Sequence, residues 1–156
     1  MNTFYGIYGA SGFGKEVLPL VKQQFGNDVK IVFVDDGDVP NELLGCVILN
    51  FDQFVNLDGK KAVTIAIANS RVREKLTLKC LENGIEIFDV KASNVVALEN
   101  VKMGIGSILC PFVTLTSDIE VGKGFQANIY SYVAHDCVIG DYVTFAPAVN
   151  AMAMCI

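Results

Sequence analysis

The residues best suited to chemistry stand in the segment HDCVIGD, which begins at His135. His135 is the only histidine of the chain, and Asp136 follows it directly. An imidazole with a pKa near ~6.5 is largely neutral at neutral pH and accepts a proton, and a nearby carboxylate fixes its tautomer. The pair could therefore act as a general base. The other interpretation is an exposed histidine at a turn.

A glycine-rich turn near the N-terminus could bind phosphate. Gly9, Gly12 and Gly14 have the spacing G-x-x-G-x-G, which differs from the dinucleotide fingerprint G-x-G-x-x-G. Glycines let the backbone approach a phosphate, and the start of a following helix offers free N–H groups. Asp35 and Asp36 end the next apolar run, where an acidic residue would contact a ribose or a base. The alternative is a tight turn that needs glycine, with two aspartates on a solvated loop.

Alternating strands and helices must position these residues. Apolar runs at 3–10, 29–36 and 62–69 predict buried strands, and the segments 14–24 and 70–84 predict helices. This order predicts a small parallel sheet with right-handed crossovers.

The second predicted helix carries further candidates. We expect Ser70 to cap it, and we expect its buried face to consist of Val72, Leu76, Cys80 and Leu81. Asn69 and Arg71 follow the third strand, where such sheets collect ligand contacts. A helix start with a solvated arginine explains these two residues equally well.

The second half of the chain has a six-residue period. Nine apolar residues recur without an insertion at Ala97, Met103, Leu109, Leu115, Val121, Ala127, Val133, Ile139 and Phe145. An α-helix cannot place this period on one face, whereas a parallel β-helix with three hexads per coil can. The residue after each hexad start is often small, and we expect the chain to bend there. The prediction is an α/β Rossmann-like N-terminal domain at 1–92, a short β-helix of three coils at 95–150, and an aberrant tail at 151–156.

The segments GIYGASGFGKE and FVDD, followed by hexads that contain AHDCVIGD, together resemble a known family. It is the sialic acid O-acetyltransferase and UDP-4-amino-sugar N-acetyltransferase family of hexapeptide-repeat sugar acyltransferases. The resemblance covers nearly the whole chain. It implies a left-handed parallel β-helix that forms homotrimers, with acetyl-CoA between neighbouring helices and a UDP-linked amino sugar on the N-terminal domain. By this resemblance His135 is the catalytic base with Asp136 beside it, and the substrate-binding residues are Gly9, Ser11, Gly12, Gly14, Asp35, Asp36, Asn69 and Arg71.

The expected function is acetyl transfer from acetyl-CoA to a UDP-linked amino sugar in bacterial surface glycan synthesis, in the cytoplasm. Members of the family continue for several more coils, and the segment VNAMAMCI departs from the repeat. We therefore expect a C-terminal truncation that impairs acetyl transfer and leaves a self-associating chain. The main alternative is an inactive fragment that only binds a nucleotide sugar. A weaker alternative is an NAD-binding module built on GASGFG, which lacks a following Tyr-x-x-x-Lys pair.

Composition argues against several other classes. The net charge of -5 argues against a nucleic-acid partner. No apolar run reaches the ~18 residues that a membrane-spanning helix needs, and the N-terminus lacks the basic region of a signal peptide. The five cysteines form no C-x-x-C pair, which argues against a zinc site. We expect them to be reduced thiols.

Overall fold

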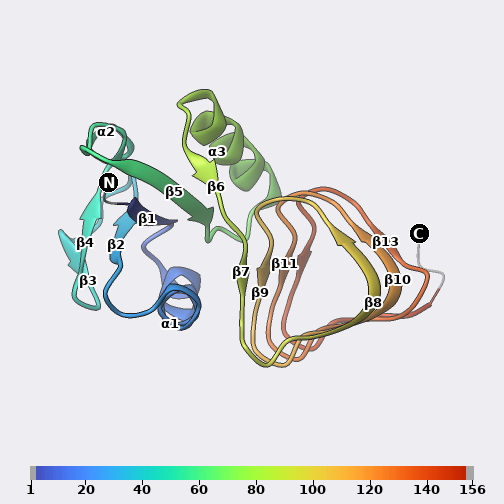
Figure 1. Ribbon diagram of the computed structural model, residues 1–156. Coiled ribbons are helices and arrows are strands. Elements are labelled where there is room, and N and C mark those ends of the chain that lie inside the picture. The colour runs from blue at the N-terminus through green and yellow to red at the C-terminus, as the bar shows by residue number, and fades with distance from the viewer. Residues whose placement is uncertain (1–2, 154–156) are drawn as a thin grey trace.

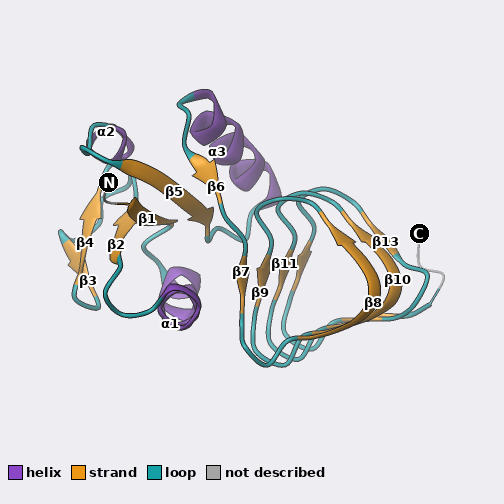
Figure 2. Ribbon diagram, viewed as in Figure 1, coloured by secondary structure: helices purple, strands orange, loops and turns teal. Residues whose placement is uncertain are grey.

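The computed structural model describes residues 3–153 and divides them into two lobes that follow each other along the chain (Figure 1). The first lobe holds a six-stranded sheet with helices, and the second is a prism of parallel coils. Within residues 3–153, helices occur only in the first lobe, while strands and loops alternate in the second (Figure 2). The predicted fold class, a Rossmann-like α/β domain followed by a short parallel β-helix, is confirmed.

The sheet of the first lobe is built on three buried parallel strands. Its strands are β1 (Thr3–Tyr8), β2 (Lys30–Val34), β3 (Glu42–Leu43), β4 (Cys46–Leu49), β5 (Lys60–Ile65) and β6 (Glu86–Ile87). Their order is β3-β4-β2-β1-β5-β6, and β1 pairs in parallel with β2 and β5. Ile7, Phe33 and Val63 are fully buried, which explains the continuous apolar runs of these strands. Because the strands are parallel, the loops after β1, β2 and β5 meet at one edge of the sheet.

Two of the three helices of this lobe begin at an asparagine whose side chain caps the helix. They are α1 (Gly12–Phe25), α2 (Phe51–Val55) and α3 (Ser70–Glu82). The start of α1 lies two residues before the predicted one, inside the glycine-rich turn. Asn50 caps α2, since its side chain accepts a hydrogen bond from the N–H of Gln53 at 2.8 Å. None of the helices that the structure describes is long and apolar enough to cross a membrane.

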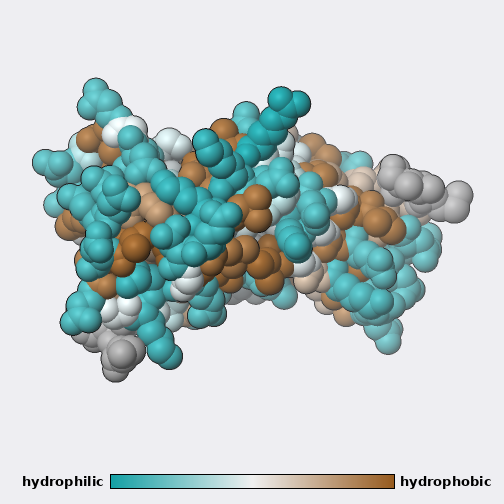
Figure 3. Space-filling view, turned by 90° about the horizontal axis from the view of Figure 1, so that it is seen from above, coloured by the Kyte–Doolittle hydropathy of each residue, from teal (hydrophilic) through white to brown (hydrophobic). Residues whose placement is uncertain are grey.

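Two predictions for α3 are wrong. The cap is Asn69 rather than Ser70, because the Asn69 side chain accepts a hydrogen bond from the N–H of Val72 at 3.0 Å. The predicted buried face is right only for Cys80, which is buried, and Leu76, which packs against the core. The other buried residues of the helix are Arg73 and Thr77. Val72 and Leu81, expected in the core, are 42% and 45% exposed. Figure 3 shows apolar groups scattered among polar ones on the surface seen from above.

The second lobe repeats itself every 18 residues, which is the separation between the paired residues Val96 and Thr114 and between Thr114 and Tyr132. The first coil strand begins at Val90, earlier than the expected boundary at residue 95, and pairs with Ile108. The last described strand reaches Ala151, which pairs with Val133 inside the expected tail. The strands are β7 (Val90–Lys91), β8 (Val96–Met103), β9 (Ile108–Leu109), β10 (Thr114–Val121), β11 (Gln126–Ala127), β12 (Tyr132–Val133), β13 (Val138–Ile139), β14 (Thr144–Phe145) and β15 (Asn150–Ala151).

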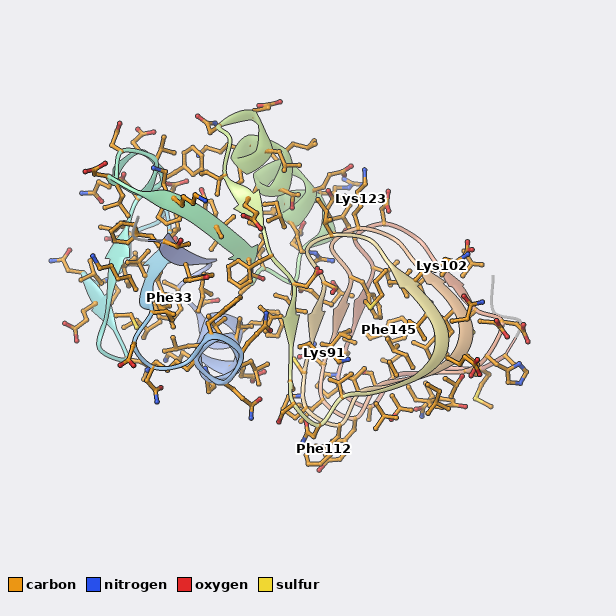
Figure 4. All side chains as sticks on the ribbon, viewed as in Figure 1. Phe33, Lys91, Lys102, Phe112, Lys123 and Phe145 are labelled. Carbon is orange, nitrogen blue, oxygen red and sulfur yellow. The ribbon has the colours of Figure 1, made fainter. Side chains whose placement is uncertain are left out.

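The interior of the prism is filled by the apolar hexad residues. Leu115, Ala127 and Val133 are fully buried, and Phe145 points into the prism, whereas Lys102 and Phe112 point outward (Figure 4). Ala97, at the first hexad, is exposed. This packing confirms the period of six as the signal of the coils.

The chain does not bend at the small residue that follows each hexad start. It bends two residues later, where Phe112, Asp118, Tyr130 and Asp136 have φ between 55° and 65°. The small residues instead let neighbouring coils approach. A Cβ atom on Gly104 would lie 2.7 Å from the carbonyl carbon of Gly122 in the next coil.

Candidate active site

His135 lies at a corner of the prism, between β12 and β13. Neighbouring side chains of an extended strand point to opposite faces, but Asp136 has a φ of 60° and turns the chain. The two side chains therefore meet, and His135 Nδ1 lies 2.6 Å from Asp136 Oδ2. An ionised carboxylate only accepts hydrogen bonds, so in the neutral imidazole this contact places the ring proton on Nδ1 and leaves the lone pair of Nε2 free. Both side chains are 62% exposed, and Nε2 can accept a proton from a bound substrate.

A polar groove of about 250 Å³ lies beside Asp136. The equivalent corner positions of the two preceding coils are Asn100 and Asp118, and the Asn100 side-chain amide donates to Asp118 Oδ1 at 2.6 Å. Lys102 and Glu120 form an exposed ion pair at 3.3 Å along the same groove. The corner that carries His135 is therefore lined by fixed polar groups that lie one coil apart.

The three positions of the N-terminal turn are occupied by glycine for different physical reasons. Gly9 has a φ of 111°, and a Cβ atom there would lie 2.8 Å from the carbonyl oxygen of Ala66. A Cβ atom on Gly14 would lie 2.1 Å from the carbonyl oxygen of Gly9. Gly12 is different, because apart from its chain neighbours and its own helix no atom lies within 4 Å of its added Cβ. Packing thus explains Gly9 and Gly14, whereas Gly12 faces open space at the start of α1.

Ser11 stands at the same place with its side chain free. It occupies the N-cap position of α1, but its hydroxyl makes no capping hydrogen bond. An N-terminus without a capping side chain leaves backbone N–H groups available for an anion. Ser11 and Gly12 are therefore the residues of the turn that are free to contact a ligand.

The two aspartates after β2 are held by the protein itself. Asp35 Oδ2 accepts from the N–H of Ala10 at 2.8 Å, and its Oδ1 accepts from the N–H of Gly37 at 2.9 Å. Asp35 thereby ties the glycine-rich turn to the loop after β2. This structural use agrees with the alternative interpretation of Asp35 as a loop residue.

Asp36 belongs to a separate cluster. Its Oδ1 accepts from the N–H of Phe51 at 2.8 Å, and its Oδ2 accepts from the Tyr8 hydroxyl at 2.5 Å and from Lys79 Nζ at 3.3 Å. Burial alone would raise the pKa of Asp36, but the hydrogen bonds from Tyr8, Phe51 and Lys79 lower it below its ordinary value. Burial, together with the hydrogen bond to Asp36, raises the pKa of Tyr8. Asp36 thus links β1, α2 and α3.

Asn69 and Arg71 have different surroundings. The Asn69 side-chain oxygen caps α3, so its position has a structural explanation. Arg71 is exposed on the outer surface of α3 and lines a shallow groove with Glu74 and Leu78. The structure therefore brings Ser11, Gly12 and Asp35 to the sheet edge and leaves Arg71 on a helix surface.

The histidine corner and the glycine-rich turn lie apart within one chain. The strands β7, β9 and β11 form the side of the prism next to the sheet, whereas β8, β10 and β13 form the side away from it (Figure 1). His135 and Asp136 belong to the distant side, because Asp136 follows β12 and precedes β13. Ser11 and Gly12 lie at the start of α1, in the first lobe.

Arg73 is a residue that the sequence analysis missed. Its side chain is fully buried between the two lobes, and its guanidinium donates to the carbonyl oxygens of Ile67 at 2.7 Å and Gly124 at 2.8 Å. Among residues 3–153, no carboxylate lies within ion-pair distance of it. The sequence offered one indication of this role: Arg73 lies on the same helix face as Thr77 and Cys80. A prediction that looks only for apolar residues does not detect a buried arginine.

Comparison with known proteins places the chain among sugar acetyltransferases. Residues 6–80 match the model of the PglD N-terminal domain family. The chain is 42% identical over 150 residues to GDP-perosamine N-acetyltransferase of Escherichia coli O157:H7, an alignment that covers 93% of this chain and 68% of that protein.

Solved structures agree with this result. WeeI from Acinetobacter baumannii AYE matches with a TM-score of 0.94 and 52% identity, over 97% of this chain and 73% of that one. The acetyltransferase domain of PglB from Neisseria gonorrhoeae FA1090, in complex with acetyl coenzyme A, matches with a TM-score of 0.86 and 22% identity. That alignment covers 96% of this chain and 73% of the PglB domain, and it shows a shared fold. The chain belongs to the family of sugar acetyltransferases that includes GDP-perosamine N-acetyltransferase.

Proposed function

We propose that the chain transfers an acetyl group from acetyl-CoA to the amino group of a nucleotide-linked amino sugar, a step in the synthesis of bacterial surface glycans. The observation that carries this proposal is the contact between His135 Nδ1 and Asp136 Oδ2 at 2.6 Å, which leaves Nε2 free. Family membership supports the same reaction, because a relative at 42% identity is named as a sugar N-acetyltransferase.

In the proposed mechanism, His135 acts as the general base. The sugar amine attacks the thioester carbonyl carbon, its proton passes to His135 Nε2, and the carbonyl electrons move to oxygen. When the carbonyl re-forms, the C–S bond breaks and the CoA thiolate takes a proton from the imidazolium. Asp136 holds the ring orientation and stabilises the imidazolium. A positioned acid–base group of this kind contributes about 10²–10⁴-fold to the rate.

The glycine-rich turn is the proposed diphosphate site. Gly12 leaves space beside the helix start, and Ser11 has a free hydroxyl. Helix N-termini favour anions through their free N–H groups and the helix dipole. The sugar nucleotide is a UDP sugar by the motif resemblance, whereas the 42% identical relative is named for a GDP sugar. An experiment therefore has to decide whether the nucleobase of the substrate is uracil or guanine.

We infer that the reaction uses more than one copy of the chain. His135 lies between β12 and β13, on the side of the prism away from the sheet that carries the glycine-rich turn, which argues against one chain holding both the amine and its base. The outer surface of β8 and the segment after β15 expose apolar side chains, with Leu98 and Met152 each 63% exposed. Covering such a surface by a second copy would complete the site. We propose a homotrimer in which neighbouring copies combine their two halves.

Turnover can be followed as free CoA released from acetyl-CoA in the presence of a GDP-linked or a UDP-linked 4-amino sugar. We expect release with one of the two sugars and its loss in His135→Ala. The exposed carboxylate Asp38 provides a control, since Asp38→Asn should leave turnover unchanged. Release that persists in His135→Ala would refute the assigned base. Sugar-nucleotide binding without CoA release in the unmodified chain would favour the binding-only function instead.

A further inference from the structure

The buried guanidinium of Arg73 joins three segments of the molecule. From α3 it donates through Nη1 to the carbonyl oxygens of Ile67 at 2.7 Å and Ala68 at 2.9 Å, in the loop after β5. Through Nη2 it donates to the Tyr142 carbonyl oxygen at 2.6 Å and to Thr144 Oγ1 at 2.9 Å, both in the coils. The fork of an arginine provides five donors in one plane, and here it binds the loop to the coils.

Two coil side chains bond directly to the same loop and to the last residue of β5. The Thr144 hydroxyl donates to the carbonyl oxygen of Ala68 at 3.0 Å. The Gln126 side-chain amide donates to the carbonyl oxygen of Ile65 at 2.7 Å, and its oxygen accepts from Arg73 at 3.2 Å. Gln126 is fully buried. The loop after β5 is thus fixed from the coil side by side-chain hydrogen bonds.

This loop in turn sets the position of the glycine-rich turn. A Cβ atom on Gly9 would lie 2.8 Å from the Ala66 carbonyl oxygen and 3.0 Å from Ile67 Cγ1. The N–H of Ala66 donates to the carbonyl oxygen of Tyr8 at 2.8 Å, directly before the turn. A displacement of residues 66–68 would therefore move Gly9 and, with it, the open space at Gly12.

We propose that Arg73 is a positioning residue of the nucleotide site, which uses the coils to fix residues 66–68 and thereby the glycine-rich turn. This inference rests on the proposed function, because it assumes that the turn binds the diphosphate. Arg73 does not need to touch the nucleotide. A lysine keeps the positive charge but lacks the planar fork, so its three donors cannot replace all the bonds that Arg73 makes to the loop and the coils.

The test is the dissociation constant for GDP and for UDP, measured by calorimetry well below the melting temperature of each variant of the full chain. We expect Arg73→Lys to weaken binding of the preferred nucleotide by about tenfold, which corresponds to about 1.4 kcal/mol. Thr144→Val removes one contact to the loop and one to Arg73, and it should weaken binding by a smaller factor. Thr116→Val is the matched control, since its hydroxyl donates to the Val133 carbonyl oxygen at 3.2 Å within the coils.

The outcomes separate this inference from the proposed function. If the unmodified chain binds neither GDP nor UDP, the proposed nucleotide site is wrong. If the unmodified chain binds a nucleotide and Arg73→Lys binds it equally well, the positioning role is wrong even where the variant melts at a lower temperature. A weakened affinity in both Arg73→Lys and Thr144→Val, with Thr116→Val unchanged, supports the role.

Discussion

The positive φ of Asp136 determines the contact between its carboxylate and the ring of the neighbouring His135. Since His135 and Asp136 are consecutive, only a turned backbone brings Oδ2 to 2.6 Å from Nδ1. The exposed position of the pair means that Asp136 is held by little other than its backbone conformation. The carboxylate is therefore expected to contribute in two ways, by orienting the imidazole and by stabilising the imidazolium with its negative charge.

Asp136→Asn should lower kcat by about 10²-fold, at the lower end of what a positioned acid–base pair contributes. The amide oxygen still accepts a hydrogen bond from Nδ1, but the negative charge that stabilises the imidazolium is lost. CoA release under saturating substrates measures the effect. Asp141→Asn is the control, because Asp141 Oδ1 accepts from the N–H of Lys123 at another corner, at 2.8 Å. Equal losses in both variants would mean that Asp136 matters only for the coil.

The Asp36 cluster makes stability depend on pH in the acid range. Its pKa in the folded protein lies below the ordinary value of 3.8, so the folded state favours the ionised form. The resulting stability is fully present above about pH 4 and is lost as the pH falls through the folded pKa. Asp36→Asn should therefore lower the melting temperature at neutral pH, and the difference from the unmodified chain should shrink below about pH 4.

Thermal melts of both proteins between about pH 2.5 and 7 provide the measurement, across the range in which carboxylates titrate. The exposed Asp38→Asn variant should show no such difference. A difference in melting temperature between Asp36→Asn and the unmodified chain that stays constant across the whole pH range would contradict the proposed link between Asp36 ionisation and stability. The Asp36 side chain is 44% exposed, so solvent screening keeps the effect small.

Among the elements, the coils were the most predictable from sequence. The hexad period reflects a repeated packing position, and Leu115 and Val133 are fully buried as it requires. The position of the bend was harder to predict from the sequence, because φ is positive at residues as different as Phe112 and Asp118. Backbone geometry, rather than residue size, sets the corner.

Only part of the candidate site could be predicted from the sequence, and the structure gives the physical reason for the part that could not. The spacing of Gly9, Gly12 and Gly14 suggested one role for all three, but only the structure separates packing from open space. Arg73 could not be assigned, since its hydrogen-bond partners such as Gly124 and Tyr142 come from coils far along the chain. Long-range polar contacts leave no periodic pattern in a sequence.

The stacked glycines of the coils allow a test of close packing between repeats. A Cβ atom on Gly122 would lie 2.4 Å from Asp141 Oδ1 and 2.7 Å from the carbonyl carbon of Gly140. Gly122→Ala should therefore destabilise the fold by about 1–3 kcal/mol, as overpacking does. Gly140→Ala is the matched variant, because no atom lies within 4 Å of its added Cβ. Urea unfolding of the two variants should separate them, and equal stability would refute the assigned role of Gly122.

For the whole molecule, the separation of the two proposed half-sites leads to a prediction about mixed oligomers. The glycine-rich turn and His135 lie on different sides of one chain. If neighbouring copies supply the two halves, a chain that lacks the catalytic base and a chain that cannot bind the nucleotide should complement each other. If one chain held the whole site, two inactive chains would stay inactive when mixed.

Gly12→Val places a side chain in the open space at the turn and should abolish nucleotide binding, since no protein atom within 4 Å opposes the added Cβ. His135→Ala should remove the base. Each variant alone is expected to be inactive, and co-expression should restore activity. With random assembly through a head-to-tail interface, a site is intact when its base comes from a Gly12→Val chain and its turn from a His135→Ala chain, which gives about a quarter of the unmodified activity. Sedimentation of the mixed sample should show an oligomer. Co-expressed chains that stay inactive while forming that oligomer would assign both halves of the site to a single chain.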